Sequence, residues 1–202
     1  MNISKVLLDL SLNSDKKLRS EMLGQLKIVS GKIVACDPLL FHKKAFKQTV
    51  PIGEYPLFVW FDEEEQIAAA ELKLAETTPV RWEMAIKPGQ KIEELKKGEI
   101  FGYPVDTGLG CFADVEAINN LEKIEAELAE ELGEDFISLY DDLVEDVLIQ
   151  NDDVWGNLEV CKDSRLNIIM FNSGYGDGFY ASYWGFDEED RIVSLVTDFN
   201  IL

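Results

Sequence analysis

Residues 57–74 read LFVWFDEEEQIAAAELKL, in which two apolar runs enclose a tight acidic knot. Aromatic and β-branched residues and the alternation in AELKL are typical of β-strands, whereas consecutive acids are typical of a turn in solvent. The stretch therefore predicts two antiparallel strands joined by a short turn.

A near copy of this hairpin occurs late in the chain. FDEEDRI at 186–192 repeats FDEEEQI at 61–67, and each copy has a Trp-containing strand before it and an apolar run after it. Hairpin turns converge easily on similar residues, so we interpret the echo as convergence and keep an internal duplication as the alternative.

The sequence around the first hairpin extends the β-rich pattern. LKIVSGKIVACDP at 26–38 puts β-branched runs on either side of Ser30-Gly31, which predicts another hairpin. VRWEMAI at 80–86 reads as a strand that continues the meander, and Pro88-Gly89 ends it.

Helices are predicted in two parts of the chain. A short N-terminal helix is expected from about Ser14, a suitable N-cap, to Leu26. Apolar residues then recur at spacings of three and four between Asp114, a credible N-cap, and Gly133, a natural stop. A second helix is expected from about Asp135 to Ile149, so the middle of the chain should form a helical pair.

These elements together predict an α+β fold. It should be mainly antiparallel β-sheet in meanders and hairpins, with a sandwich as one arrangement, plus the short N-terminal helix and a central acidic helical pair. The chain has 202 residues and no linker-like stretch, so we expect a single domain over 1–202. Its parts are an N-terminal helical segment (1–26), a first β-rich half (27–113), the helical pair (114–150) and a second β-rich half (154–202).

Charge is distributed unevenly along the chain. Residues 1–50 carry nine Lys/Arg and four Asp/Glu, a net of +5, so the remainder carries −25 of the total of −20. Between Asp114 and Asp153 there are fifteen acids and one base, Lys123. Such a surface repels nucleic acids and anionic membranes and favours a basic protein or a cation, although acidity also serves solubility alone.

Composition limits the compartment and the metal chemistry. No segment approaches the roughly 20 apolar residues of a membrane span, and the start lacks a basic leader with a cleavage site, so we expect a cytoplasmic protein. Cys36, Cys111 and Cys161 form no CxxC pair and are expected to be free thiols. His42 is the single histidine, so any metal would be bound by oxygen ligands.

Asp106-Thr107-Gly108 resembles the catalytic triplet of aspartic proteases, in which two carboxylates share a proton. The only comparable second site has Asn172 in place of the acid, so a monomer could not form that dyad. A turn that leads into the following helix explains the glycine more simply.

Two further kinds of site are open. Cys111, just before a predicted helix, could be a nucleophile with His42 as base, or simply a small buried side chain. Asp106, Asp114 and Asp177 could offer oxygen ligands to Mg²⁺ or Ca²⁺, although acids among glycines are also ordinary turn chemistry. The catalytic candidates are therefore Asp106, Cys111 and Asp177, and the metal candidates are Asp106, Asp114 and Asp177.

A ligand pocket is the third kind of site. On the strand at 80–86, alternation places Arg81 and Glu83 on one face and Trp82 on the other, as a surface ion pair or as part of a pocket. A small-ligand binder using Trp82 and Tyr175 would have a cavity lined by the loops DTGLGCF and NSGYGDG. The ligand-binding candidates are Arg81, Trp82, Glu83, Thr107, Tyr175 and Asp177.

Six blocks in this order resemble the bacterial family catalogued as domain of unknown function 4241. They are GKIVACDPL (31–39), VPIGEYPL (50–57), RWEMAI (81–86), GYPVDTGLGCFAD (102–114), NSGYGDGFYASYWGFD (172–187) and the final LVTDFNIL. The resemblance implies a cytoplasmic bacterial protein with one domain over most of the chain, and it implies no catalytic mechanism. The acidic stretch from Leu121 to Asp153 looks like an elaboration of this chain.

The leading functional hypothesis is a non-enzymatic protein-interaction module, such as an immunity-type partner of a basic toxin or nuclease, because a strong acidic field accompanies no convincing catalytic set. The alternatives are a metal-dependent hydrolase that uses the clustered carboxylates and a small-ligand-binding domain.

Overall fold

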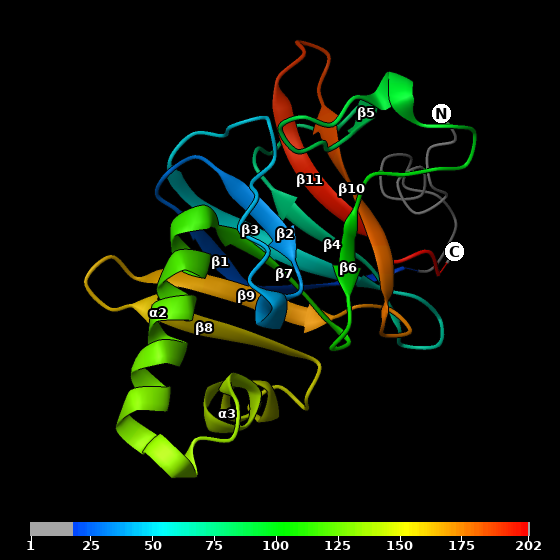
Figure 1. The fold of residues 1–202 in the computed structure, drawn as a ribbon. Helices are drawn as coiled ribbons and strands as arrows, with labels where there is room; N and C mark the ends of the chain where they lie inside the picture. The colour runs from blue at the N-terminus through cyan, green and yellow to red at the C-terminus, as the bar shows by residue number, and fades with distance from the viewer. Residues whose placement is uncertain (1–17, 202) are drawn as a thin grey trace.

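The computed structural model describes residues 18–201 and shows two antiparallel sheets beside a helical layer (Figure 1). The larger sheet contains, in spatial order, β1 (Arg19–Ile28), β3 (Gly53–Phe61), β4 (Ile67–Lys73), β11 (Ile192–Asp198), β10 (Gly178–Phe186) and β5 (Arg81–Met84), with β6 (Tyr103–Val105) also paired to β10. The smaller sheet contains β2 (Ile33–Cys36), β7 (Leu109–Asp114), β9 (Leu166–Asn172) and β8 (Trp155–Cys161). The predicted α+β class with mainly antiparallel sheet is confirmed.

The helices lie on the outer side of the smaller sheet (Figure 1). They are α2 (Val115–Leu132), the 3₁₀ turn η3 (Gly133–Asp135), the π-helical turn η4 (Tyr140–Val144) and α3 (Glu145–Ile149). We call residues 115–153 the acidic helical pair. Two further 3₁₀ turns are η1 (Pro38–Leu40) and η2 (Ile92–Glu94). Within residues 18–201, none of the helices combines the length and apolarity needed to cross a membrane.

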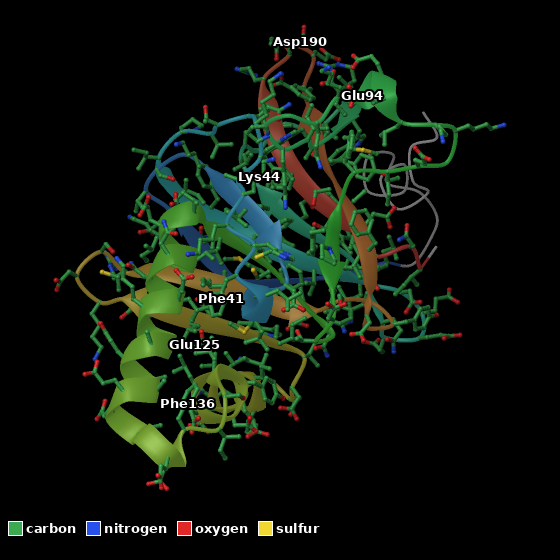
Figure 2. The ribbon with its side chains drawn as sticks, viewed as in Figure 1. Phe41, Lys44, Glu94, Glu125, Phe136 and Asp190 are labelled. Atoms are coloured by element: carbon green, nitrogen blue, oxygen red, sulfur yellow. The ribbon has the colours of Figure 1, made fainter. Side chains whose placement is uncertain are left out.

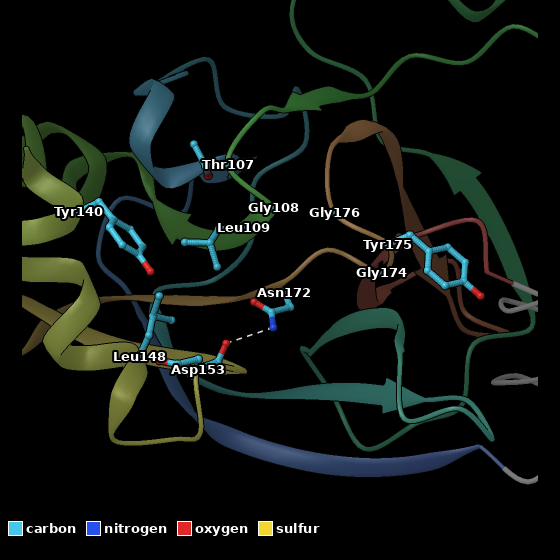
Figure 3. Close-up of a pocket in the computed structure, with 10 residues that line it drawn as sticks. All are labelled: Thr107, Gly108, Leu109, Tyr140, Leu148, Asp153, Asn172, Gly174, Tyr175 and Gly176. Carbon is cyan, nitrogen blue, oxygen red and sulfur yellow. Dashed lines mark hydrogen bonds between the residues drawn. The ribbon is translucent and has the colours of Figure 1, made fainter.

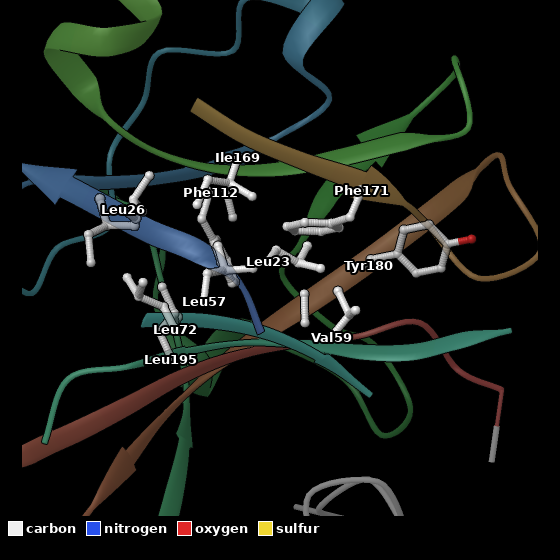
Figure 4. Packing of buried hydrophobic residues seen from close by; sticks show 14 of the residues in the cluster. Leu23, Leu26, Leu57, Val59, Leu72, Phe112, Ile169, Phe171, Tyr180 and Leu195 are labelled. Carbon is white, nitrogen blue, oxygen red and sulfur yellow. The ribbon is translucent and has the colours of Figure 1, made fainter. Parts of the chain in front are cut away.

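Three apolar clusters hold these layers together. The first lies between the sheets, where Leu72 of the larger sheet and Phe112 and Phe171 of the smaller one are fully buried (Figure 4). The second joins the smaller sheet to the helices through residues such as Ile118 of α2. The third lies on the outer face of the larger sheet and includes Trp82.

Several predicted elements are confirmed. Residues 57–74 form most of the β3–β4 hairpin, and the similar sequence at 186–192 forms the turn of the β10–β11 hairpin. The first central helix spans residues 115–132, and the Asp114 carboxylate caps it by accepting a hydrogen bond of 2.9 Å from the Glu116 N–H. Gly133 ends this helix with a φ of 58°, a conformation that glycine adopts without a steric penalty.

The predicted N-terminal helix is wrong over residues 19–26, and its first part, 14–17, lies outside the described residues. These residues belong to β1, which pairs with β3 from Arg19 opposite Phe61 to Ile28 opposite Gly53. Pairing places Leu26 and Ile28, both fully buried, in the core between the sheets. Burial and backbone pairing therefore outweigh the weak helical propensity of the segment.

The predicted hairpin at Ser30-Gly31 is also wrong, because β1 and β2 belong to different sheets. The chain leaves the larger sheet at this turn and enters the smaller one. The N–H groups of Val29 and Ser30 donate to the Asp114 carboxylate at 2.9 and 2.8 Å. A distant side chain thus fixes a turn that resembles a hairpin signal locally.

Two other expectations need correction. The strand at Arg81–Met84 does not continue a meander from β4, because β11 occupies that position and β5 pairs with β10 instead. The second central helix is shorter than predicted, since a regular α-helix covers only Glu145–Ile149. The Asp142 carboxylate accepts the N–H groups of Ile137 and Ser138 at 2.9 and 3.1 Å, which holds the preceding residues in a turn.

The two similar hairpins are equivalent in register as well as in sequence. Phe58 lies opposite Glu71 in the first, and Tyr183 lies opposite Val196 in the second, so adding 125 to both numbers maps one pair onto the other. The register shift of each hairpin also falls beside the phenylalanine that precedes the turn. The resemblance therefore extends along both strands.

Each hairpin turn is held by an arginine from a neighbouring strand. The guanidinium of Arg19 lies 4.1 Å from the ring centre of Phe61, and that of Arg81 lies 4.2 Å from that of Phe186. Each arginine forms two ion pairs. One is with the acid two residues further along its strand, and the other is with an acid of the hairpin turn whose backbone φ is positive. These acids are Glu21 and Glu65 for Arg19, and Glu83 and Asp190 for Arg81.

The smaller sheet also contains equivalent residues from the two halves of the chain. They are two fully buried aspartates, Asp37 after β2 and Asp114 at the end of β7. Each caps the helix or helical turn that follows it. Asp37 accepts the N–H groups of residues 106 and 107, and Asp114 accepts those of residues 29 and 30. The fold therefore has pseudo-two-fold symmetry, which agrees with an internal duplication and not with convergence of two isolated turns.

Candidate functional site

The loops that follow β6 and β9 meet, as the small-ligand hypothesis requires. Leu109 lies opposite Asn172 in the β7–β9 pair, so the chain segments beyond these residues lie side by side. Ser173 donates to the Gly108 carbonyl oxygen through its N–H at 3.0 Å and through its hydroxyl at 2.9 Å. The Gly108 N–H donates to Asp177 at 3.2 Å. These bonds join the two loops into one unit.

A pocket of about 340 Å³ opens where this unit meets the acidic helical pair (Figure 3). We call it the loop pocket. Tyr140 and Leu148 contribute its helical wall, and Asp153 and Asn172 lie at its base in the view of Figure 3. The remaining lining residues are Thr107, Gly108, Leu109, Gly174, Tyr175 and Gly176.

Three predicted carboxylates do not converge. Asp114 is the last residue of β7 and Asp106 lies before its first residue, so the two are at opposite ends of a strand about 17 Å long. The Asp114 carboxylate already accepts hydrogen bonds from Val29, Ser30 and Glu116. Asp177 reaches only the Gly108 N–H among the described contacts. Over residues 18–201, no three His, Cys, Asp or Glu side chains are grouped so that they could hold a metal ion.

The Thr107 hydroxyl is used in a contact with the scaffold. Its hydroxyl donates to Asp37 at 2.8 Å, beside the bonds from the backbone N–H groups of Asp106 and Thr107 at 3.0 Å. Asp37 was not among the predicted site residues. The local signal was an acid followed by Pro38, which is common at the start of a helical turn and does not reveal the distant loop that the side chain binds.

Cys111 is fully buried and lies opposite Cys36, with the two Sγ atoms 3.7 Å apart. The contact with Cys36 and burial together raise the pKa of the Cys111 thiol well above its ordinary value. A thiol in this environment stays protonated, whereas a nucleophilic cysteine needs the thiolate. His42 is exposed and has no described contact with it.

The predicted trio on β5 is divided between two faces, as the alternation indicated. Arg81 and Glu83 form a solvent-exposed ion pair, with Asp190 as a second partner of the arginine at 2.8 Å. Trp82 is buried in the cluster on the outer face of the larger sheet. None of the three lines the loop pocket, so Trp82 and Tyr175 do not share a site.

A family model described as a protein of unknown function, DUF4241, matches residues 26–197. The chain belongs to this family. The matched range begins near the end of β1, at residue 26, and includes both pocket loops and the acidic helical pair. Searches of curated proteins and of solved structures gave no match.

Pseudo-symmetry separates scaffold from candidate function in this DUF4241 fold. Arg81, Thr107 and Asp114 belong to the second half of the pseudo-symmetric fold. Their contacts are reproduced in the first half by Arg19, Ser30 and Asp37. A role that both halves share is architectural. What the first half lacks is the long segment between β7 and β9, and it is this segment that contributes the helical wall of the loop pocket.

The acidic helical pair differs from the other acidic surfaces of this DUF4241 chain. Of its fourteen acids, Glu125 (labelled in Figure 2) and Asp142 are half-buried and the other twelve are exposed. Among the ion pairs between residues 18 and 201, only Glu122–Lys43 involves one of them. The acids near the hairpin turns, by contrast, pair repeatedly with Arg19, Arg81 and Arg191.

Glu71 of β4 is a perturbed carboxyl that the sequence did not reveal. It is half-buried and accepts hydrogen bonds from Trp60 Nε1 at 3.0 Å and from the Ser194 hydroxyl at 2.8 Å. Burial raises its pKa despite these two bonds. The folded state therefore favours the protonated acid, and ionisation at higher pH works against folding.

We expect Glu71→Gln to become more stabilising, relative to the natural chain, as the pH rises from 5 to 8. Below the unfolded-state pKa of about 4.3, the glutamate is protonated in both the folded and the unfolded chain. Above this value ionisation lowers the stability of the natural chain, whereas the glutamine variant cannot ionise and is not affected. Urea unfolding across this range measures the difference. Glu159→Gln, an exposed change, is the control, and a Glu71→Gln difference that does not vary with pH would contradict the prediction.

Proposed function

We propose that this chain is a non-enzymatic protein-interaction module that binds a basic protein through the acidic helical pair. The observation that carries the proposal is the set of twelve exposed acids on this segment. Among the ion pairs of residues 18–201, only that of Glu122 with Lys43 compensates one of them. A field of one sign accelerates encounter with an oppositely charged partner and orients it.

The acidic helical pair is also a rigid support for such a surface. Ile118, Leu121 and Leu148 are buried against the smaller sheet, so the helices do not depend on a partner for their position. Rigid surfaces lose little conformational entropy on binding.

Apolar side chains are interspersed among these acids. Ile137 and Ile149 are 74 % and 58 % exposed. Protein interfaces combine an apolar centre with a polar rim, and a surface that served solubility alone would gain nothing from exposed isoleucines. Immunity-type neutralisation of a basic toxin or nuclease is one activity of this class.

The test measures association with purified basic proteins encoded beside this gene, using calorimetry at low and high salt. We expect the dissociation constant to rise at least about tenfold between 0.05 and 0.5 M salt, because screening shortens the range of the acidic field. Absence of binding, or binding that salt does not change, would remove the basis of the proposal.

A further inference from the structure

The loop pocket lies beside the proposed interaction surface and shares residues with it. Tyr140, Leu148 and Asp153 belong to the acidic helical pair and also line the pocket. Tyr140 is 37 % exposed, and in Figure 3 its ring points into the space beside Leu109. A partner that covers the helices would therefore also cover the mouth of this pocket.

The lining has acceptors and an aromatic face but no cation. The side-chain nitrogen of Asn172 donates to the Asp153 carbonyl oxygen at 3.1 Å, which leaves the amide oxygen of Asn172 as an acceptor. The Asp153 side chain is exposed and has no ion pair among residues 18–201. No lysine or arginine lines the pocket, so its negative charge is not neutralised from within.

We propose that the loop pocket receives an arginine side chain of the basic partner, with its guanidinium between the Asp153 carboxylate, the Asn172 amide oxygen and the ring of Tyr140. This proposal rests on the proposed function. A volume of about 340 Å³ is at the lower end of the range for ligand pockets and suits one long side chain.

Arginine fits this lining better than lysine. Its guanidinium is planar, carries five donors and stacks on aromatic rings, and it is more weakly hydrated than an ammonium group. Arginine side chains in desolvated pockets are also among the residues that contribute most to interface affinity. Other parts of the partner would then contact the helices around this anchor.

The test titrates the full chain with the peptide acetyl-Gly-Arg-Gly-amide and follows the backbone amide signals of Gly108, Gly174 and Gly176 by NMR. The neutral isostere, in which citrulline replaces arginine, is the ligand control. Asp153→Asn and Tyr140→Ala are the pocket variants, and Tyr140→Phe tests for rescue. Asp163→Asn, an exposed change on the β8–β9 turn, is the matched charge control.

We expect saturable shifts of the amide signals with the arginine peptide and none with the citrulline peptide. Binding of the arginine peptide should be at least threefold weaker in Asp153→Asn and Tyr140→Ala. It should be unchanged in Tyr140→Phe and Asp163→Asn. Equal shifts with citrulline, equal loss in Asp163→Asn, or no saturable shift would overturn the proposal. A pocket that takes an uncharged small molecule instead would also overturn it. Salt-sensitive partner binding that the pocket variants leave unchanged would overturn this inference while sparing the proposed function.

Discussion

Asp114→Ala is expected to lower the free energy of unfolding by at least about 3 kcal/mol. The fully buried carboxylate accepts the N–H groups of Val29, Ser30 and Glu116 and the Ser30 hydroxyl, at 2.8 to 2.9 Å. Alanine leaves these donors without their carboxylate acceptor, and each unsatisfied buried donor costs about 1–3 kcal/mol. Chemical denaturation monitored by fluorescence measures the loss.

Because the fold is pseudo-symmetric, the same loss of stability is expected at the equivalent aspartate. Asp37→Ala should cost about as much as Asp114→Ala, since Asp37 accepts the corresponding bonds from Leu39, Asp106 and Thr107. Asp114→Asn should cost less than alanine, because one oxygen acceptor remains. The exposed control Asp163→Ala should change stability by less than about 0.5 kcal/mol. If replacing either buried aspartate costs no more than this control, the interpretation that each carboxylate holds a distant turn in place is wrong.

Gly102→Ala is the second substitution for which we expect a large effect. An added Cβ would lie 2.3 Å from the Tyr180 carbonyl oxygen and 2.7 Å from its carbon, so backbone and not a flexible side chain stands in the way. The close approach is needed because β6 begins at the next residue and pairs with β10 there. We expect a loss of about 3 kcal/mol or a failure to fold, from the repulsion of overpacking.

Gly98→Ala is the matched control for this change. Its φ of +88° is unfavourable for alanine, but no atom lies within 4 Å of the added Cβ. We expect a loss of only about 1 kcal/mol, from backbone strain alone. Denaturant unfolding measures the free energy of unfolding of both variants. Comparable decreases would show that the close approach of residue 102 to β10 does not exclude a Cβ atom.

The elements that sequence reasoning predicted well are those decided by local pattern. The β3–β4 hairpin and the helix 115–132 each carry their own periodicity, turn residues and caps within one stretch. The elements it missed are decided by distant partners. The segment at Ser30-Gly31 looks like a hairpin turn because nothing nearby reveals that the carboxylate of Asp114 binds it.

In the candidate site, too, the features that the sequence did not predict depend on residues far apart in the chain. The meeting of the two glycine-rich loops follows from the pairing of β7 with β9, which depends on topology. Thr107 and Asp114 attracted attention because hydroxyl and carboxyl groups in loops are often functional, yet both bind scaffold partners. Tyr140 and Asp153 had no motif around them, and only the packing of the acidic helical pair brings them to the pocket.

A pseudo-symmetric scaffold with one asymmetric elaboration explains these observations together. The repeated contacts of Arg19 and Arg81, and of Asp37 and Asp114, stabilise the two sheets. The segment inserted between β7 and β10 adds the strands β8 and β9, the exposed acids and the helical wall of the loop pocket. The partner binding that we propose therefore belongs to the part of the molecule that breaks the symmetry.

The most direct test of this assignment compares two variants with the same change in net charge. In one, four exposed glutamates of the acidic helical pair become glutamine: Glu127, Glu130, Glu131 and Glu134. In the other, four exposed glutamates elsewhere are changed in the same way: Glu63, Glu64, Glu93 and Glu188. Affinity for the basic partner is measured at low salt for both. We predict at least about a tenfold loss for the first variant and less than about a threefold loss for the second, whereas equal losses would contradict the assignment.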